Sequence, residues 1–301
     1  MSLKSKKYPE TTKRTRDFDL LMIADSWSIQ SMMEVFEKSG IKANIAESMF
    51  PEKQLIEEIE INDIELVFSI NCEKSPPSEV FNNKKLRWVN LQFGKIPKYC
   101  GKYPVQRAII NCETELEVTL HYIDTVSGYV GIIDTKSIPI LMEDTAFTLY
   151  NRSLQEGFGL IKDNLHKLKV GNVKSTERIS CATSLWDREF SDTEFINWNS
   201  TAFKIHNQIR AYTHPFNGAK CSIHNGEMTI WKTVIGNPLS YYNPGTILEI
   251  SKNKGIITAT GSGEIHIIDY EISEEIELKE GDCFDGMFVD RHEVVCEVRS
   301  E

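Results

Sequence analysis

Two carboxamide side chains and one carboxylate stand out in the stretch 88–134 (WVNLQFGKIPKYCGKYPVQRAIINCETELEVTLHYIDTVSGYVGIID). Asn90 and Gln92 lie at the end of a short apolar run, before a Gly/Lys/Pro/Tyr loop that Gly101 closes. Asp134 follows the next β-favouring run and a glycine-punctuated segment. Amides donate and accept hydrogen bonds, and a carboxylate accepts protons. Polar groups at the ends of neighbouring strands are typical of a site on an open α/β sheet.

The elements that must position these residues alternate along the first half of the chain. Buried strands are predicted at 19–24, 41–45, 64–70, 86–91 and 118–123. Helices are predicted from Ser28 to just before Gly40, over 53–59 and over 105–111. This alternation predicts the α/β class with a parallel, doubly wound sheet.

The second half changes its hydrophobic period. Apolar spacing predicts a long helix over 145–169, although Gly157 and Gly159 interrupt it. An extended linker is expected at 171–192, and a helix or loop–helix at 193–210. Short alternating runs follow at 221–224, 228–234, 246–250, 255–260, 264–270 and 294–298. They predict a small β-barrel or sandwich, with a domain boundary between about 170 and 209.

Composition excludes several classes of function. With 34 Lys and Arg against 44 Asp and Glu, the net charge of −10 disfavours a broad nucleic-acid surface. The seven cysteines form no CxxC pair, which indicates reduced thiols and a cytoplasmic location. No apolar run approaches a membrane span, and the polar residues 1–16 are expected to form a disordered arm. The first strand–helix turn, 24–28, lacks glycine, which argues against a dinucleotide or P-loop cradle.

A family pattern runs through the central stretch. It consists of Asn, any residue, His, four residues, Pro, a basic–aromatic pair and Gly. The matching letters here are Asn90, Gln92, Pro97, the pair KY at 98–99 and Gly101. Further matching letters are AIIN (108–111), VTLHYID (118–124), IDT (133–135), IRAYTHPFNGA (209–219), MTIWK (228–232) and GIITATG (255–261). With these letters the chain resembles the folate-dependent N-formyltransferases, which include methionyl-tRNA formyltransferase and the sugar-nucleotide N-formyltransferases.

The resemblance implies a fold and its boundaries. It covers most of residues 19–285 and is most specific over 88–135. A Rossmann-like, parallel-sheet formyltransferase domain would occupy 17–175, a linker 176–205, and an OB-like β-barrel domain 206–301.

The same resemblance assigns catalytic roles. Asn90 would donate its amide to the formyl oxygen, and Asp134 would position the base. The base itself should be a histidine at position 92, where this chain has Gln92. An amide has no group that titrates near neutral pH, whereas imidazole does. Three readings stay open: an engineered substitution that traps a complex, a natural variant in which Asp134 is the base, and a catalytically dead binding protein.

Binding residues also follow from the resemblance. The folate donor would contact Val89, Leu91, Val130, Gly131, Ile132 and Ile133. The acceptor would contact Phe93, Gly94, Lys95, Lys98, Gly101 and His121. Compared with the family pattern, the chain carries extra residues between Asp124 and Asp134, at 125–130, which either extend the surface or remodel the pterin pocket. No metal site is expected, because the histidines lack ligand spacing.

These observations predict an N-formyltransferase that uses 10-formyltetrahydrofolate and a primary amine. A nucleotide-linked amino sugar is the favoured acceptor, because the acidic balance and the lack of a longer basic insertion disfavour tRNA. The rivals are methionyl-tRNA formyltransferase, hydrolysis of formylfolate and a non-catalytic folate- or nucleotide-binding relative. A homodimer is an allowed assembly, and no membrane partner is expected.

Overall fold

The computed structural model describes residues 20–24, 26–38, 40–47, 51–71, 76–83, 85–124, 129–169, 173, 177–180, 194–224, 226–272 and 276–285. The expected arm at 1–16 and the strand expected at 294–298 lie outside these residues. The chain forms two compact units. The first unit comprises Met1–Lys102, Glu117–Ser137 and Ser153–Arg188, and the second comprises Tyr103–Leu116, Ile138–Arg152 and Glu189–Glu301. Each unit is therefore built from three segments that are separated along the chain.

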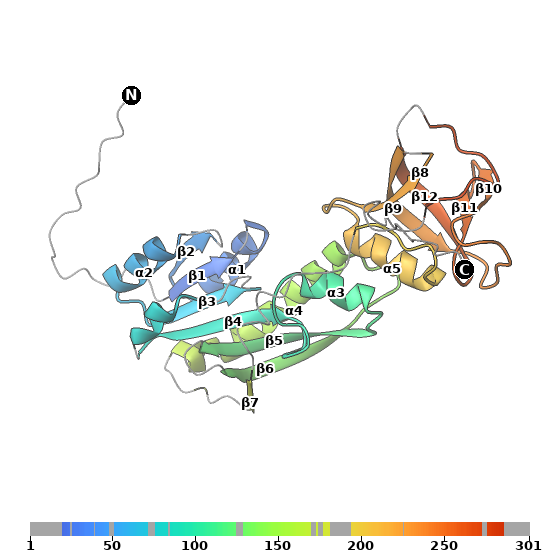
Figure 1. The fold of residues 1–301 in the computed structure, drawn as a ribbon. Helices are drawn as coiled ribbons and strands as arrows, with labels where there is room; N and C mark the ends of the chain where they lie inside the picture. Colours follow the sequence, from blue (N-terminus) through green and yellow to red (C-terminus); the bar gives the residue numbers. More distant parts are fainter. Residues whose placement is uncertain are drawn as a thin grey trace, which may run out of the picture. The chain divides into compact units, whose positions relative to one another are not determined.

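The first half of the chain forms the parallel part of a seven-stranded sheet (Figure 1). Its elements are β1 Leu20–Ala24, α1 Ser26–Lys38, β2 Ala43–Glu47, α2 Glu52–Ile61, β3 Leu66–Ile70, the 3-10 helix η1 Ser78–Asn82 and β4 Arg87–Phe93. The strands lie in the order β2-β1-β3-β4, and each neighbouring pair is parallel. The βαβ pattern predicted from the sequence is confirmed here.

The second half of the sheet is antiparallel, so the predicted Rossmann-like α/β domain is confirmed with a mixed sheet that is not parallel throughout. β5 Glu115–Asp124 pairs antiparallel with β4, and β6 Tyr129–Pro139 pairs antiparallel with β7 Glu177–Ser180. The four residues between β5 and β6, 125–128, are too few to hold a crossover helix, and parallel neighbours need one. β7 also lies inside the region expected to be an extended linker.

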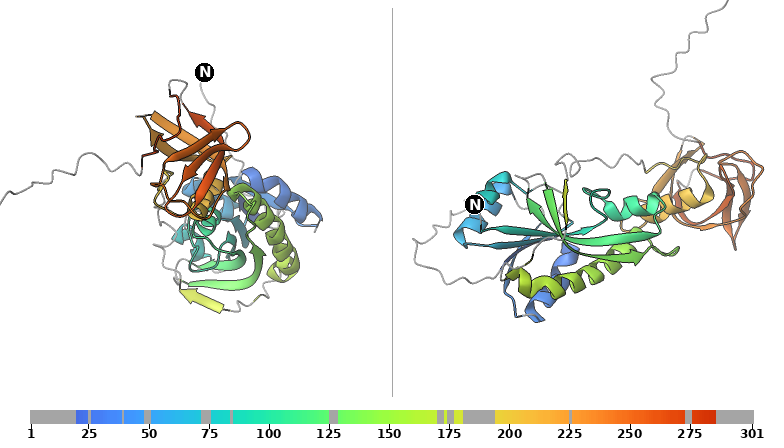
Figure 2. Two further views of the ribbon diagram at one scale, coloured as in Figure 1. Left: turned by 90° about the vertical axis from the view of Figure 1, so that its right-hand side faces the viewer. Right: turned by 90° about the horizontal axis from the view of Figure 1, so that it is seen from below.

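Helices cover both faces of the sheet. α4 Ala146–Lys169 is one continuous helix despite its two glycines. In the right panel of Figure 2, α1 and α4 lie on one face of the sheet and α2 on the other. On the α2 face, Leu55 and Ile59 pack in one core with strand residues that include Leu21, Val67 and Trp88.

The second unit contains a five-stranded antiparallel sheet in the order β10-β11-β12-β9-β8. Its strands are β8 Ala219–Ile223, β9 Gly226–Ile235, β10 Ile247–Ser251, β11 Gly255–Ala259 and β12 Glu264–Ile272. The helix α5 Ala202–Tyr212 packs on this sheet, and its N-cap Thr201 accepts a hydrogen bond from the Lys204 amide. The helix α3 Pro104–Ile110 contacts α5. A second antiparallel β-unit is thus confirmed, while closure into an OB-like barrel stays a prediction.

No helix in the described part of the chain is long and apolar enough to cross a membrane.

Candidate active site

Three polar side chains predicted for the site share one face of the first unit's sheet. Asn90 and Gln92 alternate with Leu91 along β4, so their side chains project opposite to that of Leu91. On β5, His121 lies opposite Asn90, and Thr119 lies opposite Gln92. Directly opposed residues of an antiparallel pair project on the same face. Asn90, Gln92 and His121 are therefore brought together on one face of the sheet.

Hydrogen bonds fix the Asn90 carboxamide completely. Its Oδ1 accepts from Ser69 Oγ at 2.8 Å, and Ser69 Oγ accepts from Trp88 Nε1 at 2.8 Å. Its Nδ2 lies 3.1 Å from His121 Nε2 and 3.3 Å from Gln92 Oε1. Both amide protons of Asn90 thus have acceptors, and the bond to Gln92 is the longer one.

His121 is a neutral acceptor in this network. Its Nδ1 lies 3.2 Å from the Tyr122 carbonyl oxygen, which can only accept, so Nδ1 carries the proton and Nε2 accepts from Asn90. Complete burial lowers the pKa of His121 from 6.5 to about 4, because the charged form loses its hydration. The imidazole therefore orients Asn90 and carries no charge at neutral pH.

Gln92 ties the loop 94–103 to the end of β4. Its Nε2 donates to the Tyr99 carbonyl oxygen at 3.1 Å, while Thr119 Oγ1 donates to the Gly94 carbonyl oxygen at 3.1 Å. Within this loop Lys95 and Lys98 are exposed. The loop predicted to bind the acceptor is thus anchored at the carboxamide pair, and it carries two exposed lysines.

Other predicted acceptor residues shape the same loop. Phe93 and Gly94 are buried at its start, and Gly101, also buried, has a φ of +93° that favours glycine. The Lys98 ammonium lies 5.3 Å from the centre of the Tyr99 ring.

Asp134 is not joined to these three residues, and it lies inside a strand and not at a strand end. It stands within β6 and not at the end of a loop, because the β-favouring residues from Tyr129 onward continue directly into the strand. The expected extra loop at 125–130 is correspondingly shorter, since Tyr129 and Val130 already belong to β6, while 125–128 lie outside the described residues. Asp134 Oδ2 accepts from Asn164 Nδ2 at 2.9 Å, and its Oδ1 accepts from the Thr135 amide at 2.9 Å.

The partner helix shows which face Asp134 occupies. A Cβ on Gly157 of α4 would lie 2.4 Å from Leu91 Cδ2, so α4 packs on the face of β4 opposite to Asn90. Further along α4, the Leu168 carbonyl oxygen accepts from Arg87, which has the same facing as Leu91. Asn164 lies between these two contacts, so the Asp134 carboxylate is on the α4 face. Among the described residues, it makes no hydrogen bond to Asn90, Gln92 or His121.

The predicted folate-binding residues are largely core residues. Val89 and Leu91 are fully buried on the α4 face, and Val130 and Ile132 belong to the core on the α2 face. Ile133 is buried and Gly131 is half-buried in β6. Their side chains therefore fill the sheet's own core, so any folate contact by this set would come from the main chain.

Two buried residues of the site escaped sequence reasoning. Ser69 is fully buried in β3, where it was a single polar letter in an apolar strand. Thr119 is fully buried in β5 and holds the start of the 94–103 loop. A lone polar residue inside an apolar run was the available signal for Ser69, because such groups need hydrogen-bond partners.

The arrangement provides oriented amides but no base that titrates near neutral pH. Asn90 is held rigidly enough to bind a developing oxyanion, and neither Gln92 nor neutral His121 carries a charge. Among the described residues, no group of three or more His, Cys, Asp and Glu side chains is arranged to hold a metal ion.

Two family models match the chain. The model described as "Formyl transferase" matches residues 26–163, and the one described as "Formyl transferase, C-terminal domain" matches residues 190–286. Together they cover most of both units, in the order in which the sequence resemblance predicted them.

Several solved structures share the fold. An N-formyltransferase from Helicobacter canadensis, in complex with folinic acid and dTDP-3-aminofucose, is 24% identical with a TM-score of 0.61, over 83% of this chain and 98% of that chain. The sugar 3N-formyl transferase WlaRD, with dTDP and 5-N-formyl-THF, is 23% identical with a TM-score of 0.58, over 85% and 98%. HypX from Aquifex aeolicus, in complex with tetrahydrofolic acid, is 14% identical with a TM-score of 0.63, over 83% and 43%. The chain thus spans less than half the length of HypX.

Proposed function

The chain belongs to the formyl transferase family, and we propose that it transfers a formyl group from 10-formyltetrahydrofolate to the primary amine of a nucleotide-linked amino sugar. The observation that carries this proposal is the length of the match. Both family models occur in order, and two sugar N-formyltransferases align over 98% of their own chains. The exposed Lys95 and Lys98 beside the carboxamide pair suit a ligand that carries phosphates.

The proposed reaction needs a donor for the oxyanion and an acceptor for the amine proton. Asn90 is the donor: Ser69 and His121 fix its carboxamide, so its orientation requires no rearrangement during the reaction. The formyl oxygen would take the place of Gln92 Oε1, since that contact, at 3.3 Å, is the longer of the two that Nδ2 makes.

Removal of the amine proton is the weak step. A positioned general base typically contributes 10²–10⁴-fold in rate. Gln92 supplies none, and Asp134 faces α4. We therefore expect turnover slower by about that factor than in a relative with histidine at this position.

A second candidate function follows from the lack of a base beside Asn90. A protein that binds folate and nucleotide without turnover would retain the oriented Asn90 and the anchored 94–103 loop and would need no base. Methionyl-tRNA is a less favoured acceptor, because the net charge of −10 opposes a polyanion.

The test combines turnover and binding. The full chain and the variants Gln92→His and Gln92→Asn are incubated with 10-formyltetrahydrofolate and a dTDP-linked amino sugar, and the formylated product is measured by mass spectrometry. Gln92→Asn is the control, since it changes the side chain without adding a base. Calorimetry with 5-formyltetrahydrofolate and with the sugar nucleotide measures binding separately.

The outcomes separate the candidates. Turnover by the unsubstituted chain supports the proposal, and a rise only in Gln92→His identifies the missing base as the limit. Binding of both ligands without turnover in any form supports the binding protein. If neither ligand binds, both functions are refuted. A parallel reaction with methionyl-tRNA tests that acceptor.

A further inference from the structure

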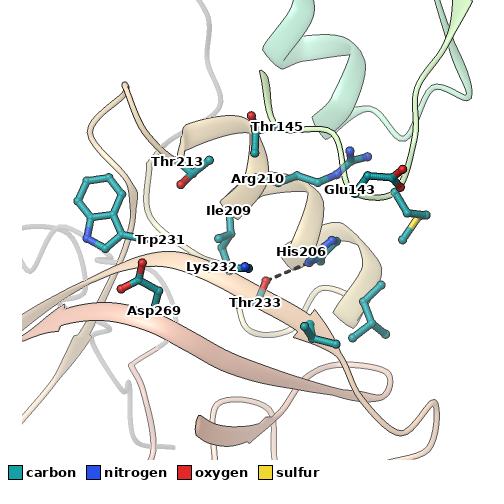
Figure 3. A pocket seen from close by; sticks show the side chains of 13 residues that line it. Glu143, Thr145, His206, Ile209, Arg210, Thr213, Trp231, Lys232, Thr233 and Asp269 are labelled. Atoms are coloured by element: carbon teal, nitrogen blue, oxygen red, sulfur yellow. Dashed lines mark hydrogen bonds between the residues drawn. The ribbon is translucent and has the colours of Figure 1, made fainter. Parts of the chain in front are cut away.

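The second unit contains a cavity of about 680 Å³. Its walls come from α5, from β9 and from the segment before α4, and all of its lining residues belong to the second unit. They are Met142, Glu143, Thr145, His206, Ile209, Arg210, Thr213, Trp231, Lys232, Thr233, Val234, Ile235 and Asp269. Figure 3 shows Arg210 and His206 on α5, with Trp231, Lys232 and Thr233 on the neighbouring strand. None of these residues takes part in the Asn90 site. A cavity of this size fits a small organic ligand.

Arg210 brings a buried positive charge to the cavity. Only 7% of the residue is exposed. Its Nε donates to Asn207 Oδ1 at 2.8 Å, and its Nη1 donates to the carbonyl oxygens of Leu141 at 2.9 Å and Asp144 at 2.6 Å. These neutral acceptors hold the guanidinium in one orientation.

The remaining nitrogen of Arg210, Nη2, makes no hydrogen bond to any residue that the structure describes. Within the described part of the chain, no carboxylate lies within ion-pair distance of the guanidinium. The nearby Asp144 carboxylate is paired with Arg152 at 2.5 Å. The negative charges of Asp144 and Glu143 act on Arg210 from a distance, but neither carboxylate forms an ion pair with it. Burying a charge without a direct ion pair is costly, and a guanidinium binds carboxylate or phosphate oxygens in a fixed fork geometry.

Most of the other lining residues are neutral or apolar. Ile209, Val234 and Ile235 supply aliphatic surface. Trp231 lines the cavity, and its ring stacks on His214 with 3.9 Å between the centroids. His206 Nδ1 is 3.0 Å from Thr233 Oγ1, and burial, with Arg210 nearby, lowers the pKa of His206.

Three further charges belong to the lining. Lys232 and Asp269 lie opposite each other on β9 and β12 and carry charges of opposite sign. Glu143 is exposed and makes no ion pair with Arg210 in the described residues. The buried charge that lacks a direct counter-ion is therefore that of Arg210.

We propose that this cavity binds a small organic anion, with its carboxylate or phosphate on Arg210 Nη2 and an apolar body against Ile209 and Trp231. The site is separate from the formyl-transfer site and does not depend on that assignment.

The test uses 1-anilinonaphthalene-8-sulfonate, an anion on an aromatic body, and its neutral analogue N-phenyl-1-naphthylamine. Binding to the full chain is followed by fluorescence, and near-UV circular dichroism confirms the native state. Thr145 caps α4 by accepting from the Thr148 amide, so Thr145→Asp retains a cap while it adds a negative charge to the cavity. Thr145→Asn is the matched neutral cap.

A second pair of variants tests the cavity's volume without touching the cap. Val234→Phe adds bulk at a lining position that is 46% exposed, so the fold tolerates it. Ile268→Phe is the control, since Ile268 is 48% exposed on the adjoining strand and does not line the cavity.

We expect the sulfonate to bind one site and the neutral analogue to bind at least about tenfold more weakly, since a charge-assisted hydrogen bond contributes that much. Thr145→Asp should weaken sulfonate binding at least about tenfold and Thr145→Asn less than about twofold. Val234→Phe should weaken it and Ile268→Phe should not. Displacement by inorganic phosphate or by benzoate supports the site and identifies the preferred head group.

The proposal is overturned by any of four results: no binding to the native chain, equal affinity for the neutral analogue, equal effects within either pair of variants, or displacement by neither anion.

Discussion

The two glycines inside α4 offer a sharp test of how the helix packs on the sheet. Gly157→Ala and Gly159→Ala make the same chemical change two residues apart in one continuous helix. In a helix interior, alanine is favoured over glycine by up to about 1 kcal/mol, because it loses less backbone entropy on folding. Any difference between the two variants therefore reports what each new methyl group contacts.

The structure gives the two positions opposite surroundings. At Gly157 the added Cβ would lie 2.4, 3.1 and 3.2 Å from Leu91 Cδ2, Cδ1 and Cγ, and Leu91 is fully buried. Overpacking of this kind costs about 1–3 kcal/mol. At Gly159 no atom lies within 4 Å of the new Cβ. We expect Gly159→Ala to stabilise by about 0.5–1 kcal/mol and Gly157→Ala to be less stable than Gly159→Ala by about 1–3 kcal/mol.

The assay is urea unfolding of both variants and of the unsubstituted chain, followed by circular dichroism. Equal stabilisation by both substitutions would refute the reasoning, since it would mean that Gly157 does not face Leu91. The placement of Asp134 depends on the same contact, because Asn164 and Gly157 lie on one side of α4. That result would therefore also reopen the case for Asp134 as a catalytic group.

Three further predictions concern single positions. The pKa of His121 falls from 6.5 to about 4 on folding, so the unfolded chain binds more protons than the folded chain between these pH values. The free energy of unfolding should therefore fall by about 3 kcal/mol as the pH drops from 6.5 to about 4, and His121→Phe should reduce this pH dependence in urea unfolding. Asp134→Asn should change ligand affinity and turnover by less than about twofold, because its carboxylate faces α4; a larger loss would contradict that placement. Gly255→Ala should lower the free energy of unfolding by at least about 2 kcal/mol, since φ is +77° and a Cβ would lie 2.0 Å from the Ile267 carbonyl oxygen. Gly40→Ala, where φ is +67° and no atom lies near the new Cβ, should cost about 1 kcal/mol in the same urea unfolding assay.

The sequence predicts the fold well where hydrophobic period and turn residues agree. The first four strands and the helices between them appear within a few residues of their predicted bounds, because each βαβ unit is a local pattern. The switch to antiparallel pairing was not predicted, since strand direction depends on which partner is nearest in space. The sequence also did not predict that 103–116 and 138–152 belong to the second unit, because this assignment rests on contacts between segments that are distant along the chain.

The candidate site was predictable only in part. Asn90 and Gln92 were correctly paired, because alternation within one strand fixes a shared face. The position of Asp134 could not be obtained in this way, because a match of three letters does not show where a strand begins. Once Tyr129 is known to start β6, the carboxylate lies inside the strand, and its contact with Asn164 decides its face.

The same network explains what Gln92 contributes to a site without a base. Its Oε1 accepts from Asn90 and its Nε2 donates to the Tyr99 carbonyl oxygen, so it links the oxyanion donor to the 94–103 loop. When a formyl oxygen accepts the hydrogen bond that Asn90 Nδ2 now donates to Gln92 Oε1, Gln92 Oε1 loses its donor. An incoming amine can then supply an N–H to that oxygen, which places the amine beside the carbonyl group. The amide would thus orient the nucleophile without removing its proton. Ligand affinity should then depend little on pH near neutrality, while any turnover should rise with pH as the free amine becomes more abundant.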